Sequence, residues 1–321
     1  MSNLMEKIFS IKEYQYKKDI TLFGFKITIN KDPLINLDNI DLLYKLLLQE
    51  QYKYTDNNMS LEDYTKMQKN FYENKDIPSE VIVGNYQWHE NYPYETFLLY
   101  EYGDIRKPIF DDFSNKIALD FACGPGRMIN RMKKIFKKVN GCDIAQRLLD
   151  EAKQLNPKSE FYLTSGDNLG NVENDYYDFI YCTISMHHIA CHSIRQNIVK
   201  NIHKALKKNG KITLQLAYNK DVPYTKENKL FINDKLVIVK EKIPMADYLS
   251  DDSSAMYTNG GFDVGIGLKD LDNLKKDFIE IFGNCHIWFS QVSHYYDDLL
   301  SAQHYKECWA TDWIYIHCVK D

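Results

Sequence analysis

The alternation of short apolar runs with longer helical patterns between residues 116 and 218 constrains the fold most strongly. Runs of β-branched and aromatic residues predict strands, and apolar residues at intervals of three and four predict helices between them. The predicted strands are 116–121, 139–142, 160–163, 178–182 and 211–217, and the predicted helices are 127–138, 145–155 and 193–208. This order is typical of βαβ units, which form a parallel sheet covered by helices on both faces.

The C-terminal residues predict the elements that complete such a sheet. A helix is expected over 270–282, and strands are expected over 285–289 and 313–319. The segment 219–268 interrupts the alternation with two prolines and a Gly260–Gly261 pair. We expect an insertion over the sheet after the fifth strand, because loops of this length are uncommon and often functional. The prediction is an α/β fold with a seven-stranded, mostly parallel sheet.

About 110 residues of different character precede this sheet and predict an accessory region over 1–110, followed by the sheet domain over 111–321. Ser60 is followed three residues later by Asp63, much like a capping box, and apolar residues at helical spacing come next. A partly helical region is therefore expected. Closer to the start, Thr21–Ile29 is an alternating, strand-like run with Gly24 near its centre.

Composition excludes several classes of function. The net charge of -5 and the pI near 6.0 give no general attraction to phosphate backbones or anionic lipid, so a nucleic-acid partner is not expected. The seven cysteines include no C-x-x-C pair, and no apolar run approaches the ~20 residues of a membrane span. We expect a cytoplasmic protein without an integral membrane segment, and the oligomeric state stays open.

A strand that ends at Asp120 and runs into Cys123-Gly124-Pro125-Gly126-Arg127 indicates a ligand site. Glycines allow a backbone to approach a ligand closely, and ligands of open α/β sheets bind beyond the carboxyl ends of the strands. Ile129 stands where the dinucleotide fingerprint has its third glycine. This departure disfavours a nicotinamide or flavin cofactor.

Two further strand ends carry polar residues in the same order along the chain. Asp143 follows the second strand, where an acid can accept hydrogen bonds from ribose hydroxyls. Asp167 and Asn168 follow the third strand and suit the amino group and ring nitrogens of adenine. Each acid alone is equally consistent with a loop residue that caps the next helix. Together they indicate a nucleoside site.

These segments resemble the motifs of class I S-adenosylmethionine-dependent methyltransferases that act on small molecules. The residues that carry the resemblance are 118–127, 141–144, 166–168, 177–189 and 206–211. The resemblance implies an enzyme with a Rossmann-like fold and S-adenosyl-L-methionine as cofactor. It assigns the methionine part to the loop Ala122–Gly126, the ribose to Asp143, and the adenine to Asp167 with Asn168. The same likeness places cofactor contacts at Asp120, Ala122, Cys123, Gly124, Gly126, Arg127, Ile144, Leu169 and Thr183. Ala122 stands where the family commonly has glycine, a change that we expect to be tolerated.

His187 and His188 follow the fourth strand and are candidates for a catalytic base, because imidazole titrates near neutral pH. The resemblance favours His188, since family members often keep a His before the hydrophobic residue that starts the helix. Equally, one or both side chains could only order the loop. His188 and His192 are four residues apart and could share a helix face that binds a metal. No acidic cluster stands beside them, although Asp221 and Asp263 could contribute from the insertion. We assign no metal.

The acceptor is a hypothesis that rests on one N-terminal segment and on the histidine pair. Lys17–Ile27 is similar to leader segments of bacterial surface-glycan assembly proteins, which favours O-methylation of a sugar, sugar nucleotide or glycan modification in capsule or lipopolysaccharide synthesis. Two alternatives stay open: methylation of nitrogen or carbon in another metabolite, and a catalytically silent, cofactor-binding partner of a glycan assembly complex. Trp88–Tyr94 and Tyr257–Asp263 could select the acceptor or could be packed connectors.

Overall fold

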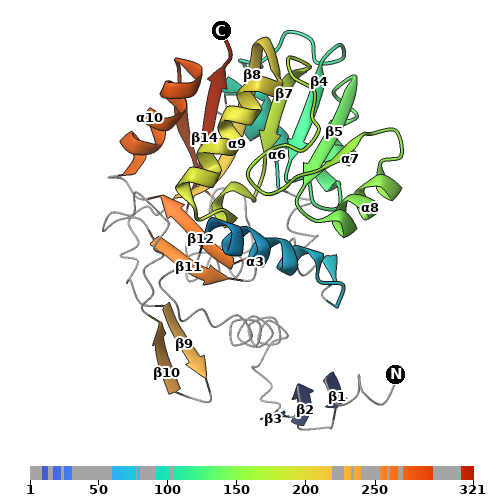
Figure 1. Ribbon diagram of the computed structural model, residues 1–321, viewed down its shortest axis with the longest axis vertical. Coiled ribbons are helices and arrows are strands. Elements are labelled where there is room, and N and C mark those ends of the chain that lie inside the picture. Colours follow the sequence, from blue (N-terminus) through green and yellow to red (C-terminus); the bar gives the residue numbers. More distant parts are fainter. Residues whose placement is uncertain are drawn as a thin grey trace. The chain divides into compact units, whose positions relative to one another are not determined.

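The computed structural model in Figure 1 describes residues 9–13, 17–22, 25–30, 60–76, 78–79, 92–101, 104–218, 228–232, 235–239, 254–258, 261–266, 270–291 and 312–321. Of the segments expected to select an acceptor, residues 88–91 and 259–260 lie outside these ranges. The chain divides into two compact units, Met1–Tyr54 and Thr55–Asp321. The boundary predicted near residue 110 stays a prediction.

The first unit contains a three-stranded antiparallel sheet of β1 (Phe9–Glu13), β2 (Lys17–Leu22) and β3 (Phe25–Asn30), with β2 in the centre. The strand-like run predicted over 21–29 is thus divided between two strands, and Leu22 pairs with Phe25. Only two residues separate these partners in the sequence, and the second is Gly24, a pattern that favours a tight hairpin.

The second unit is built on a mixed sheet whose core has seven strands. They are β4 (Ile117–Phe121), β5 (Lys138–Asp143), β6 (Phe161–Leu163), β7 (Tyr177–Cys182), β8 (Leu206–Tyr218), β13 (His286–Gln291) and β14 (Asp312–Val319). Their order is β6-β5-β4-β7-β8-β14-β13, in which β14 alone runs antiparallel to its neighbours on both sides. The predicted Rossmann-like, seven-stranded, mostly parallel sheet is confirmed.

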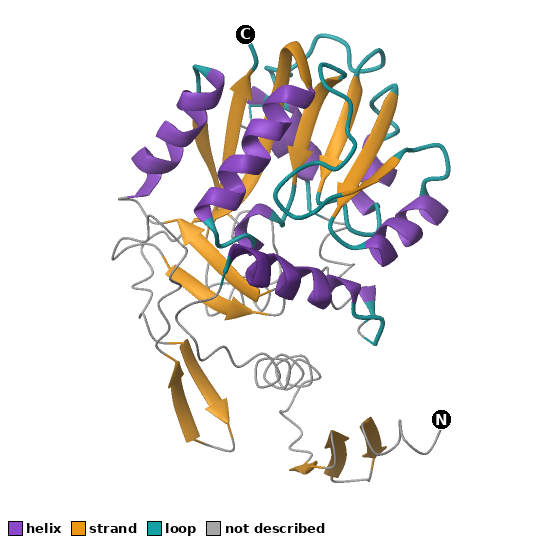
Figure 2. Cartoon of the chain, in the orientation of Figure 1, coloured by secondary structure: helices purple, strands orange, loops and turns teal. Residues whose placement is uncertain are grey.

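Helices cover both faces of this sheet (Figure 2). One face carries α6 (Tyr94–Leu99), α7 (Arg127–Met132) and α8 (Gln146–Leu155). The other carries α9 (His192–Ala205) and α10 (Leu271–Phe282), which pack on each other. Two predicted helices are too long at their C-terminal ends. The helix over 127–138 ends at Met132, and the helix over 193–208 ends at Ala205, because Leu206 already pairs with Tyr177 in the sheet.

The insertion contributes strands as well as connections. β9 (Asn228–Ile232) pairs with β10 (Lys235–Val239), and β11 (Ser254–Thr258) pairs with β12 (Gly261–Ile266). β12 also runs parallel to the end of β8 at Ala217 and Tyr218, beyond the point where β7 stops pairing with β8 at Leu214. Strands β11 and β12 of the insertion thus extend the sheet to nine strands, a pairing that the sequence pattern did not predict.

A helix from the N-terminal region, α3 (Leu61–Glu73), belongs to the second unit. The Ser60 hydroxyl accepts a hydrogen bond from the Asp63 backbone N–H at 3.0 Å and donates one to the Asp63 carboxylate at 2.7 Å. The predicted helix start at Ser60 is confirmed.

None of the helices in the described part of the chain has the length and hydropathy of a membrane-spanning segment.

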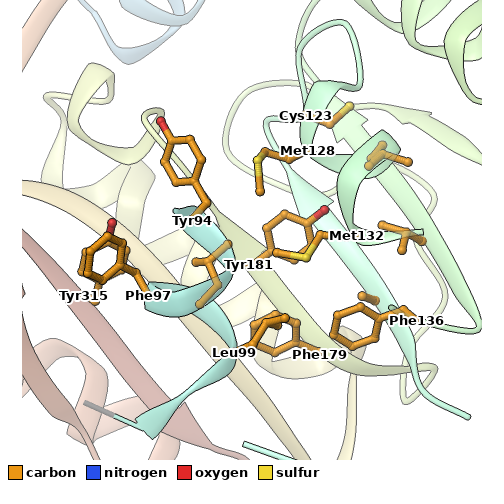
Figure 3. Packing of buried hydrophobic residues seen from close by; sticks show 14 of the residues in the cluster. Tyr94, Phe97, Leu99, Cys123, Met128, Met132, Phe136, Phe179, Tyr181 and Tyr315 are labelled. Atoms are coloured by element: carbon orange, nitrogen blue, oxygen red, sulfur yellow. The ribbon is translucent and has the colours of Figure 1, made fainter. Parts of the chain in front are cut away.

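Aromatic rings fill the core between the sheet and the helices α6 and α7 (Figure 3). Phe136 stacks on Phe179 with ring centroids 5.7 Å apart, and Phe179 stacks on Tyr181 at 5.7 Å. Farther along, Phe97 stacks on Tyr315 at 5.2 Å. Burial of such rings, at roughly 25 cal/mol per Å² of apolar surface, fixes α6 and α7 against the strands that carry the candidate site.

Gly141 of β5 lies against the loop that follows β4, and replacing it with alanine tests this packing. A Cβ atom there would lie 2.6 Å from Cys123 Sγ and 2.6 Å from Ile129 Cδ1. We expect Gly141→Ala to lower the free energy of unfolding by about 1–3 kcal/mol, measured by chemical denaturation, because overpacking forces its neighbours apart. Adding Cys123→Ala should restore part of the loss. A Gly141→Ala protein as stable as the unmodified chain would contradict this packing.

Candidate functional site

The carboxyl ends of four neighbouring strands bring most of the predicted cofactor residues to one edge of the sheet. Asp120 of β4 pairs in register with Gly141 of β5 and with Tyr181 of β7, and Asp143 at the end of β5 pairs with Leu163 of β6. The loops that leave these strands begin at residues 122, 144, 164 and 183. The structure therefore places the predicted segments side by side.

The loop after β4 alternates left-handed residues and is docked on β5. Ala122, Gly124 and Gly126 have φ of 57°, 51° and 80°. Cys123 N–H donates to the Cys142 carbonyl at 3.0 Å, and Gly124 N–H donates to Asp143 Oδ2 at 2.9 Å. Ala122 adopts a conformation that is costly for a residue with a Cβ atom. The N–H groups of Cys123 and Gly124 are hydrogen-bonded to β5. This loop can therefore contribute to ligand binding by letting a ligand come close to its backbone.

Asp120 carries a buried carboxylate whose Oδ2 accepts no hydrogen bond from the described residues. The side chain is 2% exposed. Burial raises the pKa of Asp120, the Tyr181 hydroxyl acts in the opposite direction, the Asp143 carboxylate raises it further, and Arg127 lowers it. A buried acceptor without a partner is costly. A cationic or hydrogen-bond-donating ligand beside the glycine loop would complete this group.

Asp143 links the glycine loop to the start of α8. Its Oδ2 accepts from Gly124 N–H, and its Oδ1 accepts from Ala145 N–H at 2.9 Å. Burial raises the pKa of Asp143 to about 6, although these backbone N–H groups work in the opposite direction. A carboxylate offers about four lone-pair sites, so two remain that could accept ribose hydroxyls. Ile144, the next residue, lies with its side chain against the loop after β6 at Gly166.

In the loop after β6, Asn168 holds the turn. Its Oδ1 accepts from Ser165 N–H at 3.3 Å and from Gly170 N–H at 2.8 Å, and its Nδ2 donates to Asp167 Oδ1 at 3.2 Å. The Asn168 amide is thereby used within its own loop. Leu169 is buried in the core at 3% exposure. Of the predicted adenine residues, Asp167 accepts hydrogen bonds from Ser165 Oγ and Asn168 Nδ2 through Oδ1, and Oδ2 accepts none from the described residues.

The loop after β7 contains strained backbone next to the glycine loop. Thr183 begins it and is half-buried, and Ile184 has a φ of 54°, which is rare for a β-branched residue. Ile184 N–H donates to Gln215 Oε1 of β8 at 3.0 Å, and Ser185 Oγ lies 3.4 Å from the Ala122 carbonyl oxygen. Strain of this kind concentrates at functional sites, where the surrounding structure holds it.

The two predicted catalytic histidines have different environments. They lie in a short 3-10 helix, Met186–His188, with ring centroids 3.9 Å apart. His187 is 1% exposed and its ring lies 5.3 Å from Trp313. Burial lowers the pKa of His187 well below its usual value, and His188 adds to this, so its imidazole is neutral at neutral pH. His188 is half-buried.

His188 and His192 are not brought together as metal ligands. α9 begins at His192, separately from the 3-10 helix that holds His188, and His192 Nε2 lies 2.7 Å from Asp277 of α10. Across the ranges that the structure describes, no three His, Cys, Asp or Glu side chains gather as they would around a metal ion.

Helix α3 contacts the histidine loop through two side chains that the sequence did not single out as functional. Tyr64 Oη accepts a hydrogen bond from Ala190 N–H at 2.8 Å and donates to the His188 carbonyl at 3.2 Å. Gln68 Nε2 donates to the same carbonyl. From the sequence, Tyr64 could be interpreted only as an apolar position of an amphipathic helix.

The other end of α3 contacts the loops next to Asp143 and Asp167. The Glu73 carboxylate accepts from Gln146 N–H at 2.6 Å and from Arg147 N–H at 3.3 Å, which caps the N-terminus of α8. A Cβ atom on Gly166 would lie 2.5 Å from Thr65 Cγ2. One helix therefore touches the loops after β5, β6 and β7.

Comparison with known proteins identifies the sheet region. Residues 119–214 match the family model of a methyltransferase domain. This region is therefore similar to a methyltransferase domain. A curated methyltransferase of Schizosaccharomyces pombe, whose activity is uncharacterised, is 30% identical over 110 residues, or 31% of this chain. The match covers 38% of that relative, so the chain spans less than two fifths of its length.

Solved structures share the fold of the methyltransferase domain. A SAM-dependent methyltransferase from Leishmania major is 13% identical and has a TM-score of 0.54, with 85% of this chain and 91% of that chain covered. An S-adenosylmethionine-dependent methyltransferase from Mesorhizobium loti is 12% identical and has a TM-score of 0.46, with 66% and 94% covered. The first of these likenesses supports the fold. Sequence identities this low give no basis for assigning a substrate to this chain.

Replacing Tyr64 with phenylalanine tests the contact between α3 and the histidine loop. The variant keeps the ring but leaves Ala190 N–H without its acceptor, so we expect about 1–3 kcal/mol less stability and faster hydrogen exchange at Ala190. Denaturation and exchange mass spectrometry measure the two effects. Tyr100→Phe is the control, because no hydrogen bond of the Tyr100 hydroxyl is found among the described residues. Unchanged exchange at Ala190 would refute the contact.

Proposed function

We propose that this chain transfers a methyl group from S-adenosylmethionine to a small-molecule acceptor. The observation that carries the proposal is the buried Asp120 carboxylate, which has an open oxygen beside the glycine loop of a methyltransferase domain. S-adenosylmethionine carries a sulfonium and an ammonium group, and both are cations. A desolvated carboxylate with an unpaired Oδ2 is suited to such charges.

Each of the three acids has a role in this proposal. Asp120 interacts with the positive methionine part, Asp143 accepts the ribose hydroxyls through its remaining lone pairs, and Asp167 accepts from the adenine amino group. Asn168 orients Asp167, and Ala122–Gly126 allow close approach. When bound, the cofactor supplies a methyl group that its sulfonium already activates. The protein therefore needs mainly to orient the acceptor and remove its proton.

We assign proton removal to His188 and give His187 a packing role. His188 is half-buried and its backbone is held by Tyr64 and Gln68, so the loop presents the side chain in a fixed place. The neutral His187 ring is enclosed against Trp313. The prediction that His188 rather than His187 is the base therefore accords with the difference in exposure.

For the acceptor, we propose the hydroxyl of a sugar, sugar nucleotide or glycan modification in capsule or lipopolysaccharide synthesis. Two features support this choice: a histidine base is suited to a hydroxyl, and the run Lys17–Ile27 is similar to leader segments of surface-glycan assembly proteins. Labelled S-adenosylmethionine and a panel of nucleotide-activated sugars test it. Transfer to a sugar that is lost in His188→Ala is expected, and transfer only to protein or RNA would refute the acceptor.

The Asp143 carboxyl predicts how cofactor affinity depends on pH. Because its pKa is raised to about 6, the group is ionised above that pH and protonated below it. Only the ionised form can accept from both ribose hydroxyls, so S-adenosylhomocysteine should bind about tenfold more weakly at pH 5 than at pH 7.5. Isothermal titration calorimetry at both values measures the ratio.

Two variants assign this dependence to Asp143. Asp143→Asn should bind S-adenosylhomocysteine weakly at both pH values and show a smaller ratio of the two affinities. The pH dependence that remains should come from Asp120. Asp272→Asn, a matched change at an exposed position of α10, should behave like the unmodified chain. A full tenfold ratio in Asp143→Asn would mean that another group controls binding.

A further inference from the structure

Two buried hydrogen-bond donors without acceptors lie on neighbouring strands next to the histidine loop. They are Nε2 of Gln215 in β8 and Nε1 of Trp313 in β14, and neither has a partner among the described residues. The exposed fractions of the two side chains are 0% and 2%. Buried donors are nearly always paired, so two unpaired donors on adjacent strands need a physical reason.

Gln215 reaches the loop that follows β7. Its Oε1 accepts the N–H of Ile184, the strained residue with a φ of 54°. The Nε2 donor is on the same carboxamide and therefore lies beside the same loop. The oxygen of this carboxamide holds the backbone of the candidate site, and its nitrogen has no hydrogen-bond partner among the described residues.

Trp313 lies close to Gln215 and to His187. It pairs in register with Ala217, two residues after Gln215, so the two side chains are diagonal neighbours on one face of the sheet. That face is the one covered by α6 and the aromatic rings of Figure 3. The Trp313 ring also lies 5.3 Å from the His187 ring.

The charges around the two donors decide what they can bind. Both donors are neutral, and the neighbouring His187 imidazole is neutral at neutral pH. Next to the histidine loop, the Arg195 guanidinium donates to the carbonyls of Ile189 and Ala190. A phosphate would lack a counter-charge here. A carbonyl oxygen, with two lone pairs and no net charge, suits two neutral donors.

We propose that Gln215 and Trp313 bind an uncharged carbonyl oxygen of the methyl acceptor, such as the oxygen of an acetamido group. This inference rests on the proposed function, since it places the acceptor beside His188. The two donors then select acceptors by a group adjacent to the methylated atom. An analogue without that oxygen would leave both donors buried and unpaired, which penalises its binding.

Nuclear magnetic resonance of the uniformly ¹⁵N-labelled full chain saturated with S-adenosylhomocysteine tests the site. The probes are acetamide and inorganic phosphate, titrated separately, and Trp313→Phe and Gln215→Glu assign the two side-chain signals. Acetamide should shift both signals in a saturable way, and phosphate should shift neither. Gln215→Glu keeps an acceptor for Ile184 N–H and removes the donor, so acetamide should bind about tenfold more weakly to it. Gln154→Glu, the same change at an exposed position of α8, should have no effect.

The outcomes separate this site from the proposed function. No response to acetamide, an equal response to phosphate, or unchanged acetamide binding in Gln215→Glu would overturn the site. If Gln215→Glu does not fold, Trp313→Phe with the Gln215 amide signals as the readout carries the same comparison. Calorimetry that shows no binding of S-adenosylhomocysteine would refute the proposed function, whatever acetamide does in the unsaturated protein.

Discussion

The candidate site depends on the docking of the glycine loop against β5. Two hydrogen bonds, from Cys123 N–H to the Cys142 carbonyl and from Gly124 N–H to Asp143 Oδ2, fix this loop, and only a glycine at 141 leaves room for it. The same docking brings the carboxylates of Asp120 and Asp143 to one edge, where their pKa values are raised. Two buried carboxylates at one edge repel each other when both are ionised, which raises the free energy of the unliganded site. A cationic ligand would lower that free energy.

Helix α3 lies outside the segment that matches the methyltransferase family model, yet it contacts three of the loops at this edge. Tyr64 and Gln68 hold the histidine loop, Thr65 lies against Gly166, and Glu73 caps α8. Residues from the N-terminal region therefore help to orient the loops of the candidate site. The strands β4 to β8 lie largely within the matched segment, whereas α3 and the strand β12 lie outside it.

Features that depend on local sequence were predictable. The strand and helix alternation, the glycine loop and the acids after three strands all follow from periodicity and short motifs. Contacts between distant segments were not. The bond between Tyr64 and Ala190 joins residues 126 positions apart, and β12 joins β8 by backbone pairing that its sequence does not encode. The use of Asn168 within its own turn was also missed, because an amide after a strand suits a ligand and a turn equally well.

The central claim is that the carboxyl edge of the sheet holds the cofactor through Asp120 and Asp143. A crystal structure of the chain with S-adenosylhomocysteine tests it most directly. We expect ribose hydroxyls within hydrogen-bonding distance of Asp143 and the amino-acid part of the ligand beside Asp120 Oδ2. A ligand bound elsewhere, such as in the small cavity lined by Met186, Val199 and Phe278 between α9 and α10, or a bound ligand that leaves Asp120 Oδ2 without a partner, would contradict it.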